Sequence, residues 1–519
     1  MVSITVYDGA NGIGGNKIFV EEKGRGVFLD FGRNFGKYGV YYEEFLKNRD
    51  TRGIHDLIQL DLVPKLNIYR RDLIPADIDL SAYPNLNIAA VLLSHAHLDH
   101  AGNLGLLEKE IPIVASPLSI AILKGMQDAG ASNLDNELAF ISPRGRTGDG
   151  LLLPSDRGAA YEGRNFYCTA VPGSGLQELL GHRPGEGGRG AKKYEPGSCL
   201  PLDTASLPFR VSACEVDHSI YGAVGYLLHG DTTIAYTGDF RLHGKQGDRT
   251  RDFVHRAKGA SVLIIEGTRA SRHTGPEGEA GEQPASTEKT VHDTCRAAAE
   301  QAGGLIIADF SARNFERLES FLSIAEKTGR KLVVMAKDVY LLHALECADG
   351  ICRYRPVGIY RELADQARRK WETDVVEPNA GEQYVSHTEI RNHPDRYILA
   401  FSFFDMKHLL DIRPPAGATY IYSSCEAFSE EMEIDFLRLA HWLDRFGISS
   451  CGFSLDDQGK PVFDPAYHAS GHASREDLAW VIDQVDPELI IPVHTMGREW
   501  FSEMFDRVVK VEEGVPLTV

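Results

Sequence analysis

The stretch HAHLDH at residues 95–100 directly follows AAVLLS at 89–94, an apolar run whose length and β-branched content predict a buried strand. It contains four potential metal ligands: His95, His97, Asp99 and His100. Zinc accepts imidazole nitrogens and carboxylate oxygens, and a tight loop at the end of a rigid strand can direct alternate side chains at two adjacent ions. A buried core does not need this concentration of ligand types, so the stretch predicts a metal centre.

Two further side chains that can bind metal follow other predicted strands. His218 lies just after a strand expected at 211–217, and Asp239 just after one expected at 233–238. Alone, His218 would be taken for a strand-end histidine and Asp239 for a turn residue. Together with HAHLDH, both are predicted to bind metal.

The order of these motifs resembles that of the metallo-β-lactamase superfamily. SHAHLDHAGN matches its second motif, VDHSIYGAVGY around His218 its third, and AYTGDFRLHG around Asp239 its fourth. Asp30, in VFLDFG, resembles the aspartate of the first motif, which in that family orients ligands without binding the metal itself. The resemblance implies an α/β fold, the αββα sandwich of this superfamily.

Three later residues resemble the β-CASP branch, whose nucleic-acid-processing nucleases carry a second α/β domain inserted into the sandwich. Glu266, at the end of VLIIE, resembles motif A; His472, in HASGHAS, resembles motif B; and His494, in IIPVHT, resembles motif C. A histidine at motif C resembles the RNA-processing members, such as ribonuclease J and the eukaryotic pre-mRNA 3′-end endonuclease. The DNA-repair members usually carry valine there.

The resemblance implies hydrolysis of RNA phosphodiester bonds by a hydroxide that two Zn²⁺ ions activate, with Mn²⁺ as the alternative metal. One ion is assigned to His95, His97 and His218. The other is assigned to Asp99, His100 and His494, with Asp239 bridging the two.

The candidate catalytic residues are Asp99, Asp239, Glu266 and His472. His472 is expected to act as a general acid or to bind phosphate, because an imidazole can donate a proton at neutral pH. Glu266 is expected to orient a histidine. Ser470 and Ser474 stand beside the start of a predicted helix and are expected, with His472, to contact the substrate phosphate.

The composition is that of a globular protein, with 43% hydrophobic and 25% charged residues, and a net charge of −19. Because phosphates are bound by clustered Lys and Arg, this charge excludes a general nucleic-acid coat and requires a local basic groove. The chain shows neither a signal-peptide pattern nor an apolar run of membrane-spanning length. We therefore expect a cytoplasmic enzyme without a membrane partner. Its RNA substrate, which the resemblance implies, is expected to be single-stranded.

The strand and helix pattern predicts a second domain at 268–463 between segments 1–267 and 464–519. The resemblance implies that 268–463 is a β-CASP domain and that 1–267 and 464–519 together form the metallo-β-lactamase domain. After Thr268 strands alternate with helices, which is typical of a parallel α/β layer.

Residues 126–206 are rich in Gly, Pro and Arg and poor in periodic pattern, so they predict a surface insertion. A basic flap that contacts substrate is the alternative for this insertion, through Arg183, Arg189, Lys192 and Lys193. Four other basic residues are candidate phosphate contacts in the cleft between the domains: Arg313, Arg317, Lys407 and Arg475.

Two other functions stay open. A DNA nuclease of the same branch is one, although His494 argues against it. A small-molecule hydrolase of the wider superfamily is the other; the acidic composition favours it, but it would lack the set of motifs A, B and C. The sequence decides neither between endonuclease and 5′ exonuclease action nor between a monomer and a homo-oligomer.

Overall fold

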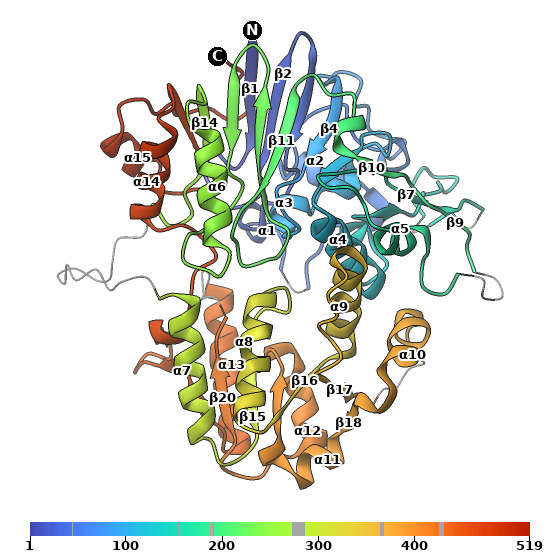
Figure 1. Ribbon diagram of the computed structural model, residues 1–519. Coiled ribbons are helices and arrows are strands. Elements are labelled where there is room, and N and C mark those ends of the chain that lie inside the picture. Colours follow the sequence, from blue (N-terminus) through green and yellow to red (C-terminus); the bar gives the residue numbers. More distant parts are fainter. Residues whose placement is uncertain are drawn as a thin grey trace.

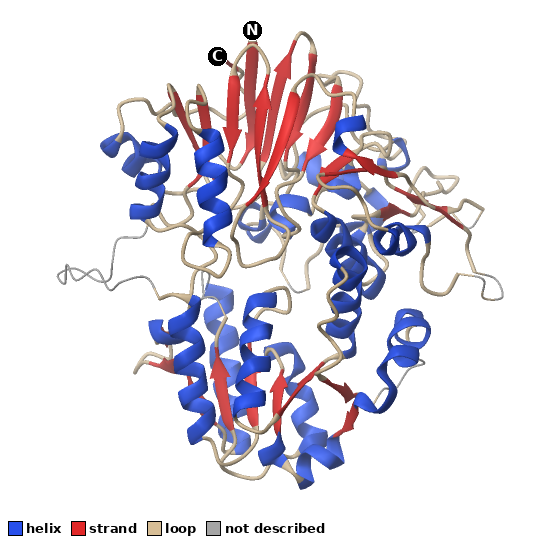
Figure 2. Cartoon of the chain, viewed as in Figure 1, coloured by secondary structure: helices blue, strands red, loops and turns tan. Residues whose placement is uncertain are grey.

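In the computed structural model the chain forms two bodies, one above the other in Figure 1. The structure describes residues 1–519 apart from 44, 154, 157, 187, 189–190, 272–285, 364–367 and 425–429, and apart from the side chains of 430–434. The upper body carries both chain ends and two sheets. The lower body holds a third sheet with helices on both sides (Figure 2).

The first sheet of the upper body has the strand order β10-β8-β5-β4-β3-β2-β1-β25. Its first strands pair as antiparallel hairpins, as the glycine turns of the sequence predict, and the strands from β3 through β10 run parallel. The strands are β1 (Val2–Asp8), β2 (Lys17–Glu22), β3 (Arg25–Leu29), β4 (Ile88–Leu92), β5 (Ile113–Ala115), β8 (Phe166–Cys168), β10 (Cys199–Pro201) and β25 (Leu517–Thr518).

The second sheet has the order β11-β12-β13-β14-β24 and faces the first. Alternate side chains such as Val2, Ile4 and Val6 of β1 share one buried core with Tyr226 and Ile264 of the second sheet, as the period of a strand requires. The strands are β11 (Arg210–Glu215), β12 (Val224–His229), β13 (Thr233–Tyr236), β14 (Val262–Glu266) and β24 (Leu489–Val493).

The lower body interrupts this second sheet. Strands β14 and β24 are parallel neighbours, with Glu266 opposite Val493, although the whole third sheet lies between them in the sequence. That sheet is parallel throughout and has the order β18-β17-β16-β19-β15-β20-β21. Its strands are β15 (Ile306–Asp309), β16 (Lys331–Val334), β17 (Gly358–Arg361), β18 (Tyr384–Ser386), β19 (Tyr397–Ala400), β20 (Thr419–Tyr422) and β21 (Ser449–Cys451), and a hairpin follows as β22 (Phe453–Leu455) and β23 (Pro461–Phe463).

Helices cover the outer faces of the sheets, so the upper body is an αββα sandwich (Figure 2). This confirms the predicted fold class. The helices of the upper body are α1 (Phe35–Gly39), α2 (His55–Gln59), α3 (Leu98–Ala101), α4 (Pro117–Ala129), α5 (Ser174–Gly181), α6 (Gly247–Ala257), α14 (Arg475–Val485) and α15 (Arg498–Met504). Those of the lower body are α7 (Glu288–Gln301), α8 (Phe315–Lys327), α9 (Ala336–Asp349), α10 (Glu377–Ala380), α11 (His387–Asn392), α12 (Leu409–Ile412) and α13 (Glu430–Phe446).

The expectation that residues 126–206 form a surface insertion is wrong for much of this segment. Strands β8 and β10 lie inside it and extend the first sheet, and α5 packs on α4 and α9. A small sheet of β6 (Phe140–Ile141), β7 (Tyr161–Gly163) and β9 (Tyr194–Glu195) completes it. Strands of two or three residues are too short to leave a period in the sequence, which is why they were not predicted.

The alternative of a basic flap in this segment is also not supported by the contacts of its side chains. The Arg183 guanidinium stacks 4.0 Å from the ring of Tyr161, and the Lys192 amine donates to the hydroxyls of Ser142 and Ser155. These cations hold the small sheet together. Arg189 lies outside the described residues.

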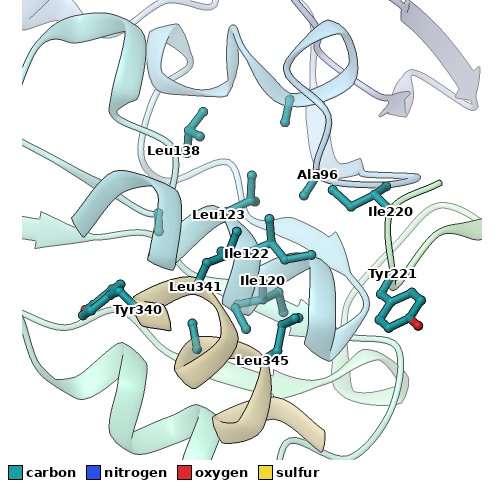
Figure 3. Close-up of a cluster of buried hydrophobic side chains, with 14 of the residues drawn as sticks. Ala96, Ile120, Ile122, Leu123, Leu138, Ile220, Tyr221, Tyr340, Leu341 and Leu345 are labelled. Carbon is teal, nitrogen blue, oxygen red and sulfur yellow. The ribbon is translucent and has the colours of Figure 1, made fainter. Parts of the chain in front are cut away.

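The two bodies share a hydrophobic core. In Figure 3, Leu341 and Leu345 of α9 in the lower body face Ile120 and Leu123 of α4 in the upper body, and all four are buried. A continuous apolar contact of this kind holds the two bodies in one relative position. Among the described helices, none is both long enough and apolar enough to cross a lipid bilayer.

Candidate metal centre

The predicted ligands gather at one end of the sandwich, because each follows the carboxyl end of a strand. His95 and His97 follow β4, His218 follows β11, Asp239 follows β13 and His494 follows β24. The strands of each sheet that carry them run in the same direction, so their loops meet at one edge. This is the edge at which α/β sheets place their ligand sites.

The first group of donors is formed by three imidazoles. His97 Nδ1 lies 3.1 Å from His95 Nε2 and 3.2 Å from His218 Nε2. One proton on His97 cannot satisfy both neighbours, whereas a central cation would satisfy all three nitrogens. Three ligands around a tetrahedral zinc with Zn–N distances of about 2.0–2.1 Å stand roughly 3.4 Å apart. The residues present therefore fit a zinc ion.

The second group combines two histidines with two aspartates. His100 Nε2 lies 3.0 Å from Asp239 Oδ2, and His494 Nε2 lies 3.2 Å from Asp99 Oδ2. Asp239 Oδ2 is also 3.8 Å from His95 Nε2 of the first group, while its buried Oδ1 has no hydrogen-bond partner. A carboxylate placed between two donor groups with a free oxygen has the geometry of a bridging ligand.

The outer nitrogens of four of these histidines are held by neighbours that fix which nitrogen faces the centre. His100 Nδ1 donates to Asp30 Oδ2 at 2.7 Å, and His218 Nδ1 donates to the carbonyl of Gly471 at 2.6 Å. His95 Nδ1 lies 3.0 Å from Ser94 Oγ, and His494 Nδ1 lies 2.8 Å from Thr268 Oγ1. The predicted orienting residue Asp30 thus contacts a ligand and stays outside the donor groups.

The backbone is strained at two of these positions. Asp30 and His494 have φ of 59° and 52°, a left-handed conformation that residues other than glycine rarely adopt. A Cβ at Gly471 would lie 2.9 Å from Ser219 Oγ and 3.1 Å from His218 Cε1, so a side chain there would push against His218. The strained backbone conformations thus occur at residues that point toward the donor groups or orient them.

Electrostatics favour the metal-binding forms of these side chains. Burial lowers the pKa of His95 and His97 well below that of an ordinary histidine, and neighbouring imidazoles lower it further. Burial would raise the pKa of Asp239, but His100 and His494 hold it well below its usual range. Burial also opposes charge on His100, yet Asp239, Asp99 and Asp30 raise its pKa, so the carboxylates demand a positive charge here.

Glu266 and His472, each predicted to be catalytic, lie beside the second group. His472 Nδ1 donates to Glu266 Oε1 at 3.1 Å and lies 3.8 Å from Asp239 Oδ2. Burial would raise the pKa of Glu266, but His472 lowers it below the usual value, so Glu266 is a carboxylate. Glu266 therefore contacts His472 directly.

The two serines predicted to contact phosphate, Ser470 and Ser474, form hydrogen bonds with the backbone of their own segment. Ser474 caps helix α14: its hydroxyl accepts the Asp477 N–H at 3.1 Å, and Asp477 returns the bond in a capping box. Ser470 Oγ accepts the N–H of His472 at 3.1 Å. Because an acidic side chain already occupies the start of α14, this helix terminus does not favour a phosphate.

Of the four cations predicted to line the cleft, Arg313 lies near the donor groups. Burial lowers the pKa of His97, and electrostatic repulsion from His218 and Arg313 lowers it further. The prediction for Arg317 is wrong, since its guanidinium is buried and donates to Glu288 at 2.9 Å and to the carbonyl of Ser423 at 2.6 Å. Arg475 donates to the carbonyl of Ala270 at 2.6 Å, and Lys407 is exposed in the segment Phe403–His408.

Two families of known proteins match the segments that carry these residues. The model described as "Metallo-beta-lactamase superfamily" matches residues 67–144, which include His95 through His100. The model described as "Zn-dependent metallo-hydrolase RNA specificity domain" matches residues 466–503, which include His472 and His494. The chain therefore contains a segment of a metallo-β-lactamase domain and a segment of an RNA specificity domain of Zn-dependent metallo-hydrolases. It is a metal-dependent hydrolase.

Over most of its length the chain is similar to proteins named Ribonuclease J. It is 23% identical over 507 residues to that of Pyrococcus abyssi, covering 95% of this chain and 90% of the relative. It is 21% identical to that of Sinorhizobium meliloti and 22% identical to that of Thermus thermophilus. These matches cover 82% and 84% of this chain but only 60% and 64% of the two bacterial relatives. A crystal structure of an Enterococcus faecalis V583 protein of unknown function matches all of both chains with a TM-score of 0.66 and 21% identity, which supports the fold.

One network beside this candidate metal centre could not be predicted from the sequence. The buried Arg241 donates to Asp217 at 3.2 Å, to Glu288 of α7 at 2.9 Å and to Glu316 of α8 at 2.6 Å, and also to the carbonyl of Ser470 at 3.2 Å. Arg241 thereby ties the loops that carry His218, Asp239 and His472 to the lower body. Its acidic partners Glu288 and Glu316 lie 47 and 75 residues away in the sequence, so no local sequence pattern predicts these contacts.

We expect Asp30→Asn to lower metal affinity about 10- to 100-fold. Asp30 Oδ2 accepts hydrogen bonds from His100, from the Ser94 hydroxyl at 2.8 Å and from the Tyr236 hydroxyl at 2.5 Å. An amide would turn a donor toward one of these donors. Competition with a chelating dye measures the affinity, and Asp79→Asn at an exposed aspartate is the matched control. Equal affinities for wild type and Asp30→Asn would contradict an orienting role.

Proposed function

We propose that the chain is a ribonuclease that hydrolyses phosphodiester bonds of single-stranded RNA with two Zn²⁺ ions, for which Mn²⁺ can substitute. The observation that carries the proposal is the pair of donor groups joined by Asp239, with His472 and Glu266 next to them. The similarity to proteins named Ribonuclease J supports RNA as the substrate.

In this proposal, one ion would be held by His95, His97 and His218 and the other by Asp99, His100 and His494, and Asp239 would belong to both ligand sets. Such ions, when bound, supply a nucleophilic hydroxide at neutral pH and neutralise the charge on the phosphate oxygens. The protein contributes the fixed direction of each donor. Asp30, Ser94, Gly471 and Thr268 provide that direction from outside the two groups.

His472 is the residue that we propose as proton donor. Since its Nδ1–H is held by Glu266, Nε2 is the atom that can give a proton to the leaving oxygen. Its ring lies 5.2 Å from that of His218 and 5.8 Å from that of His494, so it stands over both donor groups. The cation of Arg313 near His97 and Asp99 is the candidate contact for a substrate phosphate.

We expect His472→Ala to lower kcat for RNA about 10²- to 10⁴-fold, as loss of a general acid does. Glu266→Gln should lower kcat about 10- to 100-fold, because it weakens the bond that orients His472. Since both residues act through one imidazole, Glu266→Gln should have little further effect in the His472→Ala background. Steady-state kinetics of the single and double variants, at equal metal content, measures this. Independent, multiplying losses would contradict a shared role.

The proposed substrate is tested by cleavage of end-labelled single-stranded RNA and DNA of one sequence, after metal analysis of the protein. Cleavage of RNA with about two metals bound per chain supports the proposal, and the product ladder separates endonuclease from 5′ exonuclease action. Equal cleavage of DNA would show a nuclease of the same branch without RNA preference. If metal-loaded protein cuts neither polymer, the nucleic-acid assignment fails and a small-molecule substrate becomes the leading hypothesis.

A further inference from the structure

Three consecutive residues, Ser470–His472, connect the proposed proton donor with a proposed metal ligand. The His472 imidazole donates from Nδ1 to Glu266 Oε1 at 3.1 Å, and the backbone N–H of His472 donates to Ser470 Oγ at 3.1 Å. The carbonyl of Gly471 accepts the Nδ1–H of His218 at 2.6 Å. We call Ser470–His472 the SGH loop. Its position decides where the His472 imidazole stands relative to the donor groups.

The Ser470 carbonyl is held by the segment that follows Asp239. It accepts a hydrogen bond from Arg241 Nη1 at 3.2 Å and another from His243 Nε2 at 2.9 Å. A carbonyl oxygen has two lone pairs, so it can accept both bonds. Because a carbonyl cannot donate, Nε2 carries the proton of the His243 imidazole. The SGH loop is thus fixed at Ser470 by two side chains and at Gly471 by a third.

Of the two donors to Ser470, His243 is the one whose contacts are directed at the SGH loop. Arg241 also donates to three carboxylates, so its guanidinium serves mainly the ion-pair network between the two bodies. The His243 side chain is only 11% exposed, and its Nδ1 lies 4.0 Å from Asp477 Oδ2 in the first turn of α14. The His243 imidazole therefore lies between the carbonyl of the SGH loop and the helix that follows the loop.

The backbone on both sides of His243 is anchored. The Arg241 N–H donates to the Asp217 carbonyl at 2.8 Å, and the Lys245 N–H donates to Glu316 Oε1 at 3.0 Å. A side chain whose own position is locked in this way can fix the group that it contacts. His243 therefore restrains the SGH loop and does not simply follow it.

We propose that His243 is a positioning residue: it holds the Ser470 carbonyl and thereby fixes the place of the His472 imidazole beside the donor groups. This inference rests on the proposed ribonuclease function. Proton transfer needs the donor within hydrogen-bond reach of the leaving oxygen, so a displacement of about 1 Å can cost on the order of 10²-fold in rate. The bond from His218 to Gly471 does not involve His243, so metal binding should stay as in the wild type.

The test compares His243→Gln, His243→Asn and His243→Leu. Glutamine places an amide N–H where Nε2 of the imidazole stands, whereas asparagine places it near Nδ1, out of reach of the Ser470 carbonyl. We expect His243→Asn and His243→Leu to lower kcat for RNA about 10- to 100-fold, with little change in KM and unchanged metal content. His243→Gln should recover most of the loss, because it restores the donor.

His343→Leu on helix α9 is the matched control. The Nδ1 of His343 lies 4.0 Å from a carboxylate oxygen of Glu346, as the Nδ1 of His243 does from Asp477. This variant should keep the wild-type kcat and KM.

A second substrate separates lost positioning from general damage to the site. The p-nitrophenolate of bis(p-nitrophenyl) phosphate leaves without a proton, so its hydrolysis does not need a general acid. His243→Leu should therefore slow this reaction much less than it slows RNA cleavage. In the His472→Ala background, His243→Leu should have little further effect on RNA cleavage, since the imidazole that it positions is gone.

Three results would overturn the proposal while the ribonuclease function stands: equal kcat for His243→Gln and His243→Leu, equal losses on both substrates, or losses that multiply with His472→Ala. If His243→Leu does not fold, His243→Gln and His243→Asn give the same comparison with two polar side chains. A wild type that cleaves no RNA would instead refute the proposed function, and this inference with it.

Discussion

Replacing Asp239 with asparagine should lower RNA cleavage by at least about 10³-fold, because metal ions contribute several kcal/mol to the stabilisation of the transition state. Asp239 Oδ2 lies 3.0 Å from His100 Nε2 and 3.8 Å from His95 Nε2, so one side chain serves both donor groups. Asparagine keeps the shape but removes the charge that would balance two dications. Metal analysis should show fewer than two ions per chain, and end-labelled RNA measures the activity.

The control for Asp239→Asn is Asp293→Asn. Asp293 is an exposed aspartate of α7 that, like Asp239, lies beside a histidine, since its carboxylate is 3.2 Å from His292 Nδ1. It should bind metal and cleave RNA as the wild type does. If Asp239→Asn retained two ions and full activity, the bridging assignment would be wrong. Loss of activity with two ions still bound would instead assign Asp239 to the reaction itself.

Replacing Arg241 with methionine should destabilise the protein by about 3–5 kcal/mol, the usual cost of removing one partner from a buried ion pair. Asp217 and Glu316 are buried against this guanidinium and would be left without their cation, whereas Glu288 would keep its bond from Arg317. Lysine at this position cannot reproduce three directed donations, so Arg241→Lys should recover only part of the loss. Urea denaturation followed by two spectroscopic probes measures the effect and shows whether the two bodies separate.

Arg249→Met is the matched control for Arg241, because its guanidinium pairs with Glu215 at the surface, where an ion pair contributes roughly 0–1 kcal/mol. Should Arg241→Met be no less stable than Arg249→Met, the buried network would not hold the bodies together. We also expect Arg241→Met to weaken metal binding, since Arg241 contacts Asp217, next to His218. Unchanged metal affinity would limit its role to stability.

The sequence by itself was sufficient for the parts of this protein that are local. A buried strand followed by HAHLDH places its ligands through neighbouring backbone alone, and strands β4, β14 and β24 are long enough for their apolar runs to be recognised. The order of the remaining motifs then located His218, Asp239 and His494, and the structure brings them together. The resemblance that these motifs carry implied the sandwich, and the alternation of strands and helices after Thr268 predicted the second α/β layer.

Other features depended on contacts between distant residues, and only the tertiary structure decided them. Arg317 was predicted to face substrate but is buried against Glu288, and Ser474 serves a helix cap. Strands β8 and β10 were not recognised, because two short runs become a sheet only when a neighbouring strand supplies the hydrogen bonds. Composition and period describe a residue's chemistry and local backbone, whereas burial and partners are properties of the folded chain.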